Sequence, residues 1–318
     1  MSSAQLQRDT VKAEAKRLGF SHCGLAPAEE VDEAYMRHYE QWLSEGRQAG
    51  MHYLERHLAL RRDPRRLLPG ARTVVSLAMS YNPGAAPTQP AIAWYAQGRD
   101  YHDVIRQRLQ ILLQVLGVEG RICVDTAPLM EKYWAWRCGL GWIGRHTQLV
   151  IPREGSAFFL AELLLTQASD HYDAPLFARP YHEGCDACRR CVEACPTSAL
   201  SDEGIDARRC LSYLTIEHRG PLPDESYRHL SECFYGCDRC LRACPHLSHE
   251  ATSVPDFAPS QQLLAMSPCD WSRLTPLQYQ SLFHGSAVKR AKYEGLMRNI
   301  DRGGVNNLVC KSLRESDN

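Results

Sequence analysis

The feature that most constrains this chain is a pair of cysteine runs in its second half. The first run reads Cys-x2-Cys-x2-Cys-x3-Cys-Pro from Cys185 to Pro196, and a near repeat follows from Cys237 to Pro245. This spacing is typical of bacterial ferredoxins that carry two 4Fe–4S clusters. Three thiolates on a tight loop bind three irons of one cluster, and the fourth thiolate serves the other cluster.

This crossing rule sorts the cysteines into two ligand sets. The first set is Cys185, Cys188, Cys191 and Cys244. The second set contains Cys195, Cys237 and Cys240 and lacks one ligand. Two cysteines compete for that place, Cys210 and Cys233, and we favour Cys210 because three residues, rather than the usual two, separate Cys233 from Cys237.

Structural zinc sites and disulfides also give rise to paired cysteine motifs. Zinc takes tetrahedral sets of four thiolates or imidazoles, which does not account for a run of three thiols ending in Cys-Pro. Disulfides belong to oxidising compartments and small secreted domains. Iron–sulfur chemistry therefore accounts for the doubled run best.

The composition indicates a globular chain of about two domains. Its 318 residues carry no net formal charge. Charged side chains near the N-terminus stand where a secretory signal would need an unbroken apolar segment. The longest apolar run, residues 157–165, contains Glu162 and is too short to span a membrane. We expect a cytoplasmic protein with no membrane contact, and contacts with nucleic acid only through local basic clusters at residues 61–66, 208–209 and 289–302.

Apolar periodicity and turn residues predict helices alternating with a few strands. We expect helices at residues 4–18, 29–43, 51–60, 101–116 and 129–137. Pro128 is expected in the first turn of the helix at 129–137. Three more helices are expected at residues 261–266, 276–283 and 287–300. We expect strands at residues 23–25, 73–80, 121–124 and 156–166, the last possibly a sheet edge, and loops at residues 82–90 and 139–144. This order predicts an α+β fold.

The same pattern divides the chain into three parts and a linker. Residues 1–166 form an N-terminal mixed α/β domain, and residues 167–182 form a polar linker. Residues 183–248 form a ferredoxin-like module, and residues 249–318 form a short helical cap. Since a ferredoxin needs only about sixty residues, the N-terminal domain is expected to hold the electron acceptor.

Three features of that domain are candidate sites: Asp125 at a strand end, the glycine-rich loop at residues 139–144, and the aromatic stretch at residues 94–102. An aspartate before a helix is more often a cap than a catalyst. The glycine spacing is followed by an apparent strand, so it does not match a dinucleotide-binding motif.

Several motifs in order resemble the epoxyqueuosine reductase family. They are Val-Asp-Thr-Ala-Pro from Val124, Gly-Leu-Gly-Trp-Ile-Gly from Gly139, the two cysteine runs, and Arg-Arg-Cys-Leu-Ser-Tyr-Leu from Arg208. Residues 95–102 and 286–299 are similar to further motifs of that family. The resemblance covers nearly the whole chain.

The resemblance implies a cobalamin-dependent iron–sulfur oxidoreductase whose N-terminal domain is reductive-dehalogenase-like. Such an enzyme reduces epoxyqueuosine to queuosine at the first anticodon position of tRNA, the last step of queuosine biosynthesis. It implies Cys210 as the eighth cluster ligand and Asp125 as the acid beside the cofactor. For that role we expect burial against the corrin to raise the pKa of Asp125. Other expected corrin contacts are Arg56, Thr126, Ala127, Tyr133, Gly139, Gly141, Trp142, Ile143, Gly144, Arg145 and His146.

The expected partners are a tRNA anticodon stem-loop and an external electron donor, and the chain is expected to be a monomer. His146 as a cobalt ligand is disfavoured, because such a histidine more often hydrogen-bonds the cofactor's side chains. Alternatives are a reductive dehalogenase-like small-molecule cobalamin reductase, a non-catalytic electron carrier and a zinc-bound nucleic-acid module. No role is assigned to the remaining cysteines, which are Cys23, Cys123, Cys138, Cys233, Cys269 and Cys310.

Overall fold

A four-stranded antiparallel sheet forms the centre of the N-terminal half. The computed structural model describes residues 5–84, 92–230 and 233–302. The strands are β1 (His22–Pro27), β2 (Thr73–Ser80), β3 (Gly120–Cys123) and β6 (Phe158–Leu165), in the order β1-β2-β6-β3. The expected strand at residues 156–166 is therefore present, but it lies inside the sheet and not at its edge.

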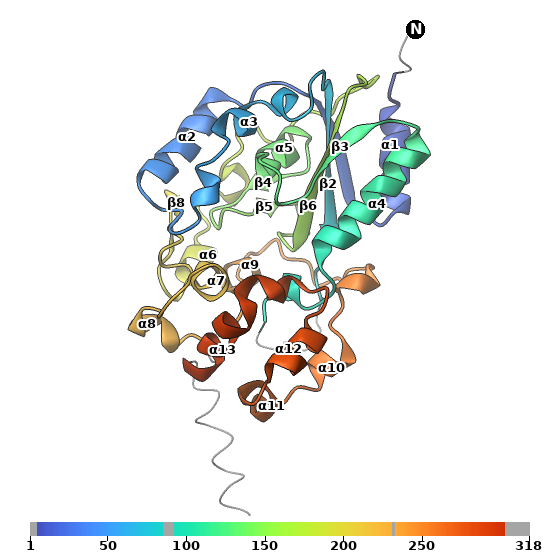
Figure 1. Ribbon diagram of the computed structural model, residues 1–318. Helices are drawn as coiled ribbons and strands as arrows, with labels where there is room; N and C mark the ends of the chain where they lie inside the picture. Colours follow the sequence, from blue (N-terminus) through green and yellow to red (C-terminus); the bar gives the residue numbers. More distant parts are fainter. Residues whose placement is uncertain (1–4, 85–91, 231–232, 303–318) are drawn as a thin grey trace, which may run out of the picture.

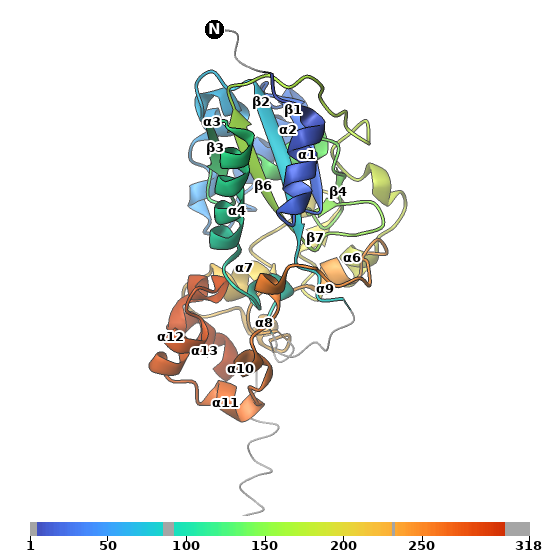
Figure 2. The same cartoon turned by 90° about the vertical axis from the view of Figure 1, so that its right-hand side faces the viewer.

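Helices cover both faces of this sheet (Figures 1 and 2). α1 (Arg8–Arg17) and α4 (Tyr101–Leu116) pack with Val75, Leu77 and Met79 of β2 on one face. α2 (Glu33–Ser44) and α5 (Glu131–Arg137) pack with Val74 and Ala78 on the other. Successive residues of a strand point to opposite faces of the sheet. Because helices cover both faces here, the apolar residues of β2 are buried along most of its length.

The segment at residues 51–60 is not the single helix that was expected. It forms a 3-10 turn, η1 (His52–Leu54), and then α3 (Leu58–Arg62), followed by η2 (Pro64–Arg66). Between η1 and α3, His57 has φ of +61°, which lies outside the right-handed helical region and interrupts the helix.

Two details around the glycine-rich segment also differ from expectation. Pro128 precedes α5 rather than lying in its first turn. Part of the expected loop is the short strand β4 (Trp142–Ile143), which pairs with β5 (Leu149–Val150). A Cβ at Gly141 would lie 2.0 Å from the carbonyl oxygen of Val150, so this close pairing requires glycine.

The cysteine-rich segment is built from short elements that lie between the sheet and the C-terminal helices (Figures 1 and 2). They are η4 (Glu183–Cys185), α6 (Arg190–Glu193), β7 (Leu200–Ser201), β8 (Gly204–Ile205), α7 (Leu211–Ile216), α8 (Asp224–Tyr227) and α9 (Arg239–Arg242). Such short elements bury little apolar area, so bound clusters are expected to add much of the stability of this segment.

The C-terminal helices pack against Ile216 of α7 and against Phe234 and Tyr235, which precede the second cysteine run. They are α10 (Gln261–Leu264), α11 (Pro268–Ser272), α12 (Pro276–Leu282) and α13 (Lys292–Arg302), with the 3-10 turns η5 (Pro255–Phe257) and η6 (Ala287–Ala291). The expected helices are confirmed, except that η6 begins the last one and that α11 was not foreseen. Buried Asn299 donates to the carbonyl oxygens of Thr215 (2.9 Å) and Phe234 (2.8 Å) and so joins α13 to the cysteine-rich segment.

Residues 92–102 connect the N-terminal domain with this C-terminal core. Ile92 and Ala96, the latter in η3 (Trp94–Ala96), pack with Tyr235 and the C-terminal helices. The expected loop at residues 82–90 lies mostly outside the described residues. None of the described helices is long and apolar enough to cross a membrane.

Candidate active site and iron–sulfur centres

The first group of thiols surrounds a small cavity. Cys185, Cys188, Cys191 and Cys244 line it together with Gly184, Arg145, His146, Pro245 and His246. The thiol of Cys191 interacts electrostatically with those of Cys185, Cys188 and Cys244, so both cysteine runs contribute to one site. The indole N–H of Trp142 donates to Cys185 Sγ at 3.3 Å.

A second group of thiols forms from three separate segments. Cys240 interacts electrostatically with Cys237, Cys210 and Cys195. The backbone N–H of Ala199 donates to Cys195 Sγ at 3.2 Å. The fold therefore brings the second cysteine run, the end of the first run and the start of α7 together.

Cys210 and Cys233, the two candidates for the eighth ligand, differ in what their sulfurs face. Cys210 interacts with Cys195 and Cys237. Cys233 also interacts electrostatically with Cys237, but its Sγ lies 3.3 Å from the carbonyl oxygen of Tyr235 and 3.1 Å from that of Gly236. A thiol that donates to backbone carbonyls is oriented away from a metal-ligand position.

Both groups fit iron–sulfur clusters by their chemistry. Burial raises the pKa of five of these thiols, to about 11 for Cys191, so without metal these five remain protonated at neutral pH; the other four of the five are Cys210, Cys237, Cys240 and Cys244. Backbone N–H groups near Cys210, Cys237 and Cys244 oppose that rise and stabilise sulfur anions. Among the residues that the structure describes, no three Cys, His, Asp or Glu side chains approach closely enough for a single metal ion, whereas four thiols around a cavity suit a larger cluster.

Asp125 follows β3 in a left-handed conformation, with φ of +55°. Its backbone N–H donates to Glu131 Oε1 at 2.6 Å. The N-cap of α5 is Met130, and no side chain caps that helix. The capping role that is common for such an aspartate therefore does not apply, and more than half of the side chain is exposed.

A row of charged side chains begins at Asp125. Asp125 Oδ2 lies 3.2 Å from His102 Nε2, and the other ring nitrogen of His102 lies 2.7 Å from Asp100 Oδ1. Asp100 Oδ2 lies 2.6 Å from Lys289 Nζ. The row joins the end of β3, the start of α4 and η6. The aromatic stretch at residues 94–102 was a candidate site in the sequence, but its pairing with Asp125 was not predicted.

The pKa of Asp125 is lowered, contrary to the raised value that we expected. Partial burial pushes the pKa up, but the hydrogen bond and positive charge of His102 outweigh burial. For His102, burial alone would lower the pKa, yet its hydrogen bonds to Asp100 and Asp125 raise it to about 9. At neutral pH the proton of this pair is therefore on the imidazole and not on Asp125.

Two further carboxyl groups lie beneath Asp125. Burial and the nearby Asp125 raise the pKa of Glu131 to about 8. Fully buried Glu162 has a raised pKa because of desolvation and its proximity to Glu131, and it accepts from Ser76 Oγ at 3.0 Å. Both are therefore protonated at neutral pH.

Several residues predicted as corrin contacts are buried in protein contacts instead. Tyr133, Trp142 and Ile143 are almost completely buried. A Cβ on Gly139 would lie 2.6 Å from the carbonyl oxygen of Ala174, and Gly141 is as tightly enclosed by Val150. Packing within the protein therefore accounts for these residues.

Gly144, Arg145 and His146 lie near the first thiol group. Arg145 pairs with Asp202 and donates to the carbonyl oxygen of Asp186 at 2.9 Å. Both ring nitrogens of buried His146 have partners, Gln148 N–H at 3.1 Å and Ser156 Oγ at 3.2 Å. Burial and Lys132 lower its pKa to about 4. A Cβ on Gly144 would lie 2.8 Å from Val150 Cγ2.

Arg56 and Thr126 are exposed, and Ala127 is half-buried. Thr126 Oγ1 accepts from Arg106 at 3.1 Å. Tyr53, which the sequence did not single out, interacts electrostatically with Asp125 and lies under the guanidinium of Arg290. These groups form the accessible surface around Asp125.

The basic clusters are largely paired with acidic side chains. Arg62 pairs with Glu33 and Glu40, and Arg208 pairs with Asp206. Lys289 and Arg290 pair with Asp100 and Glu217. Their positive charge is therefore partly neutralised within the protein. Lys292 is exposed.

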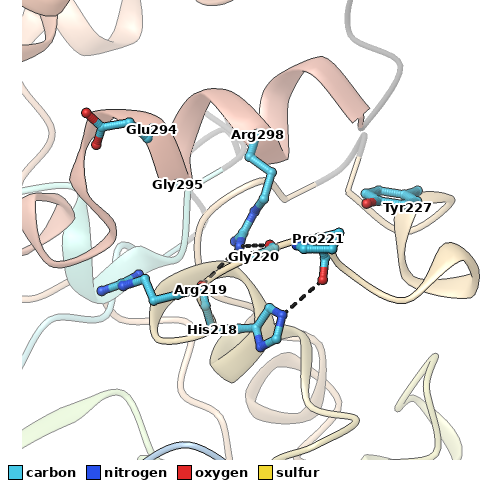
Figure 3. A pocket seen from close by; sticks show the side chains of 8 residues that line it. All are labelled: His218, Arg219, Gly220, Pro221, Tyr227, Glu294, Gly295 and Arg298. Atoms are coloured by element: carbon cyan, nitrogen blue, oxygen red, sulfur yellow. Dashed lines mark hydrogen bonds between the residues drawn. The ribbon is translucent and has the colours of Figure 1, made fainter.

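A separate surface cavity of about 410 Å³ lies between α13 and the loop after α7 (Figure 3). Its residues are His218, Arg219, Gly220, Pro221, Tyr227, Glu294, Gly295 and Arg298. The Arg298 guanidinium donates to the carbonyl oxygens of Leu214, His218 and Gly220. These hydrogen bonds hold the loop against α13, and the Arg298 guanidinium therefore has few N–H donors left for a ligand.

Known proteins resemble this chain both in two separate segments and over nearly its whole length. Residues 61–126 match the family described as epoxyqueuosine reductase QueG, DUF1730, and residues 184–246 match a 4Fe-4S double cluster binding domain. An epoxyqueuosine reductase of Cellulophaga algicola is 38% identical over 95% of this chain and 99% of its own length. That of Leadbetterella byssophila is 39% identical over 91% and 96%.

Solved structures agree with these sequence matches. An epoxyqueuosine reductase crystallised with a tRNA-Tyr epoxyqueuosine-modified stem loop is 25% identical, with a TM-score of 0.83 over 93% of this chain and 80% of its own. The enzyme of Streptococcus thermophilus is 26% identical, with a TM-score of 0.81 over 96% and 83%.

The fold and the two thiol groups define an iron–sulfur oxidoreductase with a double-cluster module. The two reductases that are 38% and 39% identical match over nearly the full length of this chain and of their own chains. The chain belongs to the epoxyqueuosine reductase family.

Proposed function

We propose that this protein reduces epoxyqueuosine to queuosine in the anticodon stem-loop of tRNA. Family membership over nearly the whole chain supports the reaction, and the acidic group at Asp125 between the sheet and the cluster module supports the site. The overall change breaks both carbon–oxygen bonds of the epoxide and forms an alkene. It consumes two electrons and two protons and releases water.

The two thiol groups are the proposed cluster sites. Cys185, Cys188, Cys191 and Cys244 hold one 4Fe–4S cluster, and Cys195, Cys210, Cys237 and Cys240 hold the other. The mutual interactions of the thiols within each set support this division. The clusters pass electrons singly, as such centres do.

Cobalamin is the proposed second cofactor, beside Asp125 on the surface that includes Arg56, Thr126 and Ala127. When bound, cobalamin supplies the low-valent cobalt chemistry that reduces the epoxide carbon. The carboxylate of Asp125 also accepts a hydrogen bond from the Tyr101 hydroxyl, but more than half of the side chain is exposed, so it can meet a substrate oxygen. We retain Gly144, Arg145 and His146 as residues near the clusters and exclude the buried Tyr133, Gly139, Gly141, Trp142 and Ile143 from direct corrin contact.

This assignment divides the chain by role. Residues 1–166 bind cobalamin, residues 183–248 hold the clusters after the linker at 167–182, and the helices from residue 249 onward support the RNA-facing side. An external electron donor reduces the clusters. The enzyme acts as a monomer in the cytoplasm, where tRNA is modified.

An anaerobic assay with defined substrates tests this function. Protein with reconstituted clusters and cobalamin is reduced and mixed with a stem-loop that carries epoxyqueuosine, and the nucleosides are then analysed by mass spectrometry. We expect queuosine at the expense of epoxyqueuosine. Unchanged epoxyqueuosine, together with dehalogenation of a halogenated phenol by the same preparation, would instead support a small-molecule reductase.

A further inference from the structure

His102 lies between two carboxylates, one beside each ring nitrogen. Its Nδ1 lies 2.7 Å from Asp100 Oδ1, and its Nε2 lies 3.2 Å from Asp125 Oδ2. Ionised carboxylates only accept hydrogen bonds. The pKa values of Asp100 and Asp125 are both lowered, so both carboxyls are ionised at neutral pH and both ring nitrogens donate, as in the imidazolium form.

The position of the ring is fixed by its surroundings. Asp100 is almost completely buried, caps α4 by accepting from the backbone N–H of His102 at 3.1 Å, and is bound by Lys289 at 2.6 Å. The ring of His102 stacks on that of Tyr101 with a centroid distance of 4.0 Å, and Tyr101 in turn stacks on Phe159. The imidazole is therefore held against Asp125 by a rigid arrangement.

The charges around His102 come from each element packed against it. Asp100, Asp125 and Glu131 interact with it directly. Lys289 from η6 is bound to Asp100, while Arg290, Tyr53 and the hydroxyl of Tyr101 act on Asp125. The nearest charges are the two carboxylates, so the surroundings favour a proton on the ring at neutral pH.

The reaction needs two protons, but Asp125 is ionised in the free protein. A carboxylate beside the epoxide oxygen would repel the negative charge that develops there. Covering the exposed Asp125 with cofactor and substrate removes water from it and raises its pKa. A proton from the adjacent imidazolium can then reach it across one hydrogen bond.

We propose that His102 is a positioning residue that stores the proton for Asp125 and reloads it for the second transfer, with Asp100 and Lys289 holding the ring. This inference rests on the proposed function. In each transfer the N–H bond at His102 Nε2 breaks and an O–H bond forms on Asp125 Oδ2. That bond then breaks as the proton passes to the departing oxygen. The neutral ring regains a proton from solvent, to which one fifth of its side chain is exposed.

The pH profile of a single turnover separates this role from a structural one. We compare wild type with His102→Gln, which keeps hydrogen-bonding capacity but carries no proton at neutral pH. We expect a loss of about tenfold to a hundredfold at pH 7 that shrinks as the pH falls toward 5, because solvent then protonates Asp125 directly. Asp125→Asn should be impaired at every pH. The matched control is His171→Gln, the same change at an exposed histidine near the start of the chain's linker, which should behave as wild type.

A titration without turnover provides an independent measurement. In the full chain with oxidised clusters and no cobalamin, NMR of labelled histidine should show one signal that is missing in His102→Gln and that titrates at about pH 9. Asp125→Asn should lower that midpoint by at least about one pH unit, since an opposite charge is lost. A His102 midpoint near the ordinary value of about 6.5 would overturn the proposal.

The outcomes also separate this inference from the proposed function. If wild-type enzyme leaves epoxyqueuosine unchanged, the function itself fails. If wild type converts it and His102→Gln matches wild type at each pH, only the role of His102 fails. Should His102→Gln lose RNA or cobalamin binding, His102→Ala with added imidazole replaces it, and restored turnover that rises with imidazole concentration is the expected result. Absence of rescue in a variant that binds both would count against proton storage.

Discussion

The indole N–H of Trp142 donates a hydrogen bond to the sulfur of Cys185 at 3.3 Å. Trp142 belongs to β4 of the N-terminal domain, and Cys185 begins the first cysteine run. The ring of Trp142 also contacts Phe177 and His246, and a Cβ on Gly184 would lie 2.5 Å from it. The glycine-rich segment therefore reaches the first proposed cluster, although the sequence indicated a corrin contact.

Replacing Trp142 with phenylalanine should lower the reduction potential of that cluster. Hydrogen bonds to cluster sulfurs stabilise the reduced, more negative form. Phenylalanine keeps most of the packing but removes the donor. A redox titration followed by EPR measures the potential. Trp136→Phe is the control, since its indole donates to the carbonyl oxygen of Phe177 and not to sulfur; equal shifts in both variants would contradict the prediction.

Cys210→Ala should remove one cluster, whereas Cys233→Ala should leave both. The sulfur of Cys210 faces Cys195 and Cys237, while that of Cys233 faces backbone carbonyls. Iron analysis of anaerobic protein should fall from about eight per chain to about four in Cys210→Ala alone. The reverse pattern would transfer the ligand role to Cys233.

Cys244→Ala should affect the first cysteine run, from which it is distant in sequence. The thiol of Cys244 interacts with those of Cys185 and Cys188. We expect lower iron content and faster proteolysis near residues 185–191, because the loss of a ligand loosens the loop that the cluster orders. An iron content of about eight in this variant would show that the crossed division is wrong.

Asp125→Asn should lower single-turnover rates by about a hundredfold or more while cofactors and RNA still bind. Asparagine keeps the shape and hydrogen bonding but transfers no proton at neutral pH. Absorption spectra and RNA binding check that the site is intact. A rate within about threefold of wild type would remove Asp125 from the mechanism.

Affinity for the stem-loop should fall steeply with salt, by several tenfold steps if about six phosphates are contacted. Joint replacement of Lys289, Arg290 and Lys292 with glutamine should flatten the dependence. Lys292→Gln alone is the comparison, because Lys292 is exposed whereas Lys289 and Arg290 are paired with Asp100 and Glu217, so it should account for much of the change. An unchanged slope in the triple variant would move the RNA surface to residues 61–66 or 208–209.

Glu162→Gln should make the protein more stable than wild type at high pH. The folded-state pKa of Glu162 lies well above its ordinary value. The contribution of the Glu162 carboxyl to the free energy of unfolding is therefore complete below about pH 4.5, which is its pKa in the unfolded chain. This contribution is lost progressively as the pH rises toward the pKa of Glu162 in the folded protein. Glutamine cannot ionise, so the difference in melting temperature between variant and wild type should grow from about pH 5 to about pH 9. A constant difference would mean that Glu162 does not titrate on unfolding.

Local patterns in the sequence determined much of the secondary structure. The predicted bounds of β2 and α4 agree with the structure, because the apolar spacing and the stop at Gly117 depend only on neighbouring residues. The cysteine spacing likewise predicted the double-cluster module, since one tight loop sets the arrangement of three thiols. The break at His57 was missed because a single left-handed residue leaves the apolar pattern of residues 51–60 intact.

Only the tertiary structure decided which distant groups meet. Spacing favoured Cys210 over Cys233 without deciding between them, and the fold places the sulfur of Cys210 near Cys195, Cys237 and Cys240, while that of Cys233 lies against backbone carbonyls. Asp125 could be predicted as a candidate, but its protonation could not, because it depends on His102, a residue of another element 23 positions away. Charges and hydrogen bonds act through space, so the chemistry of this site follows from the fold that brings α4, β3 and η6 together.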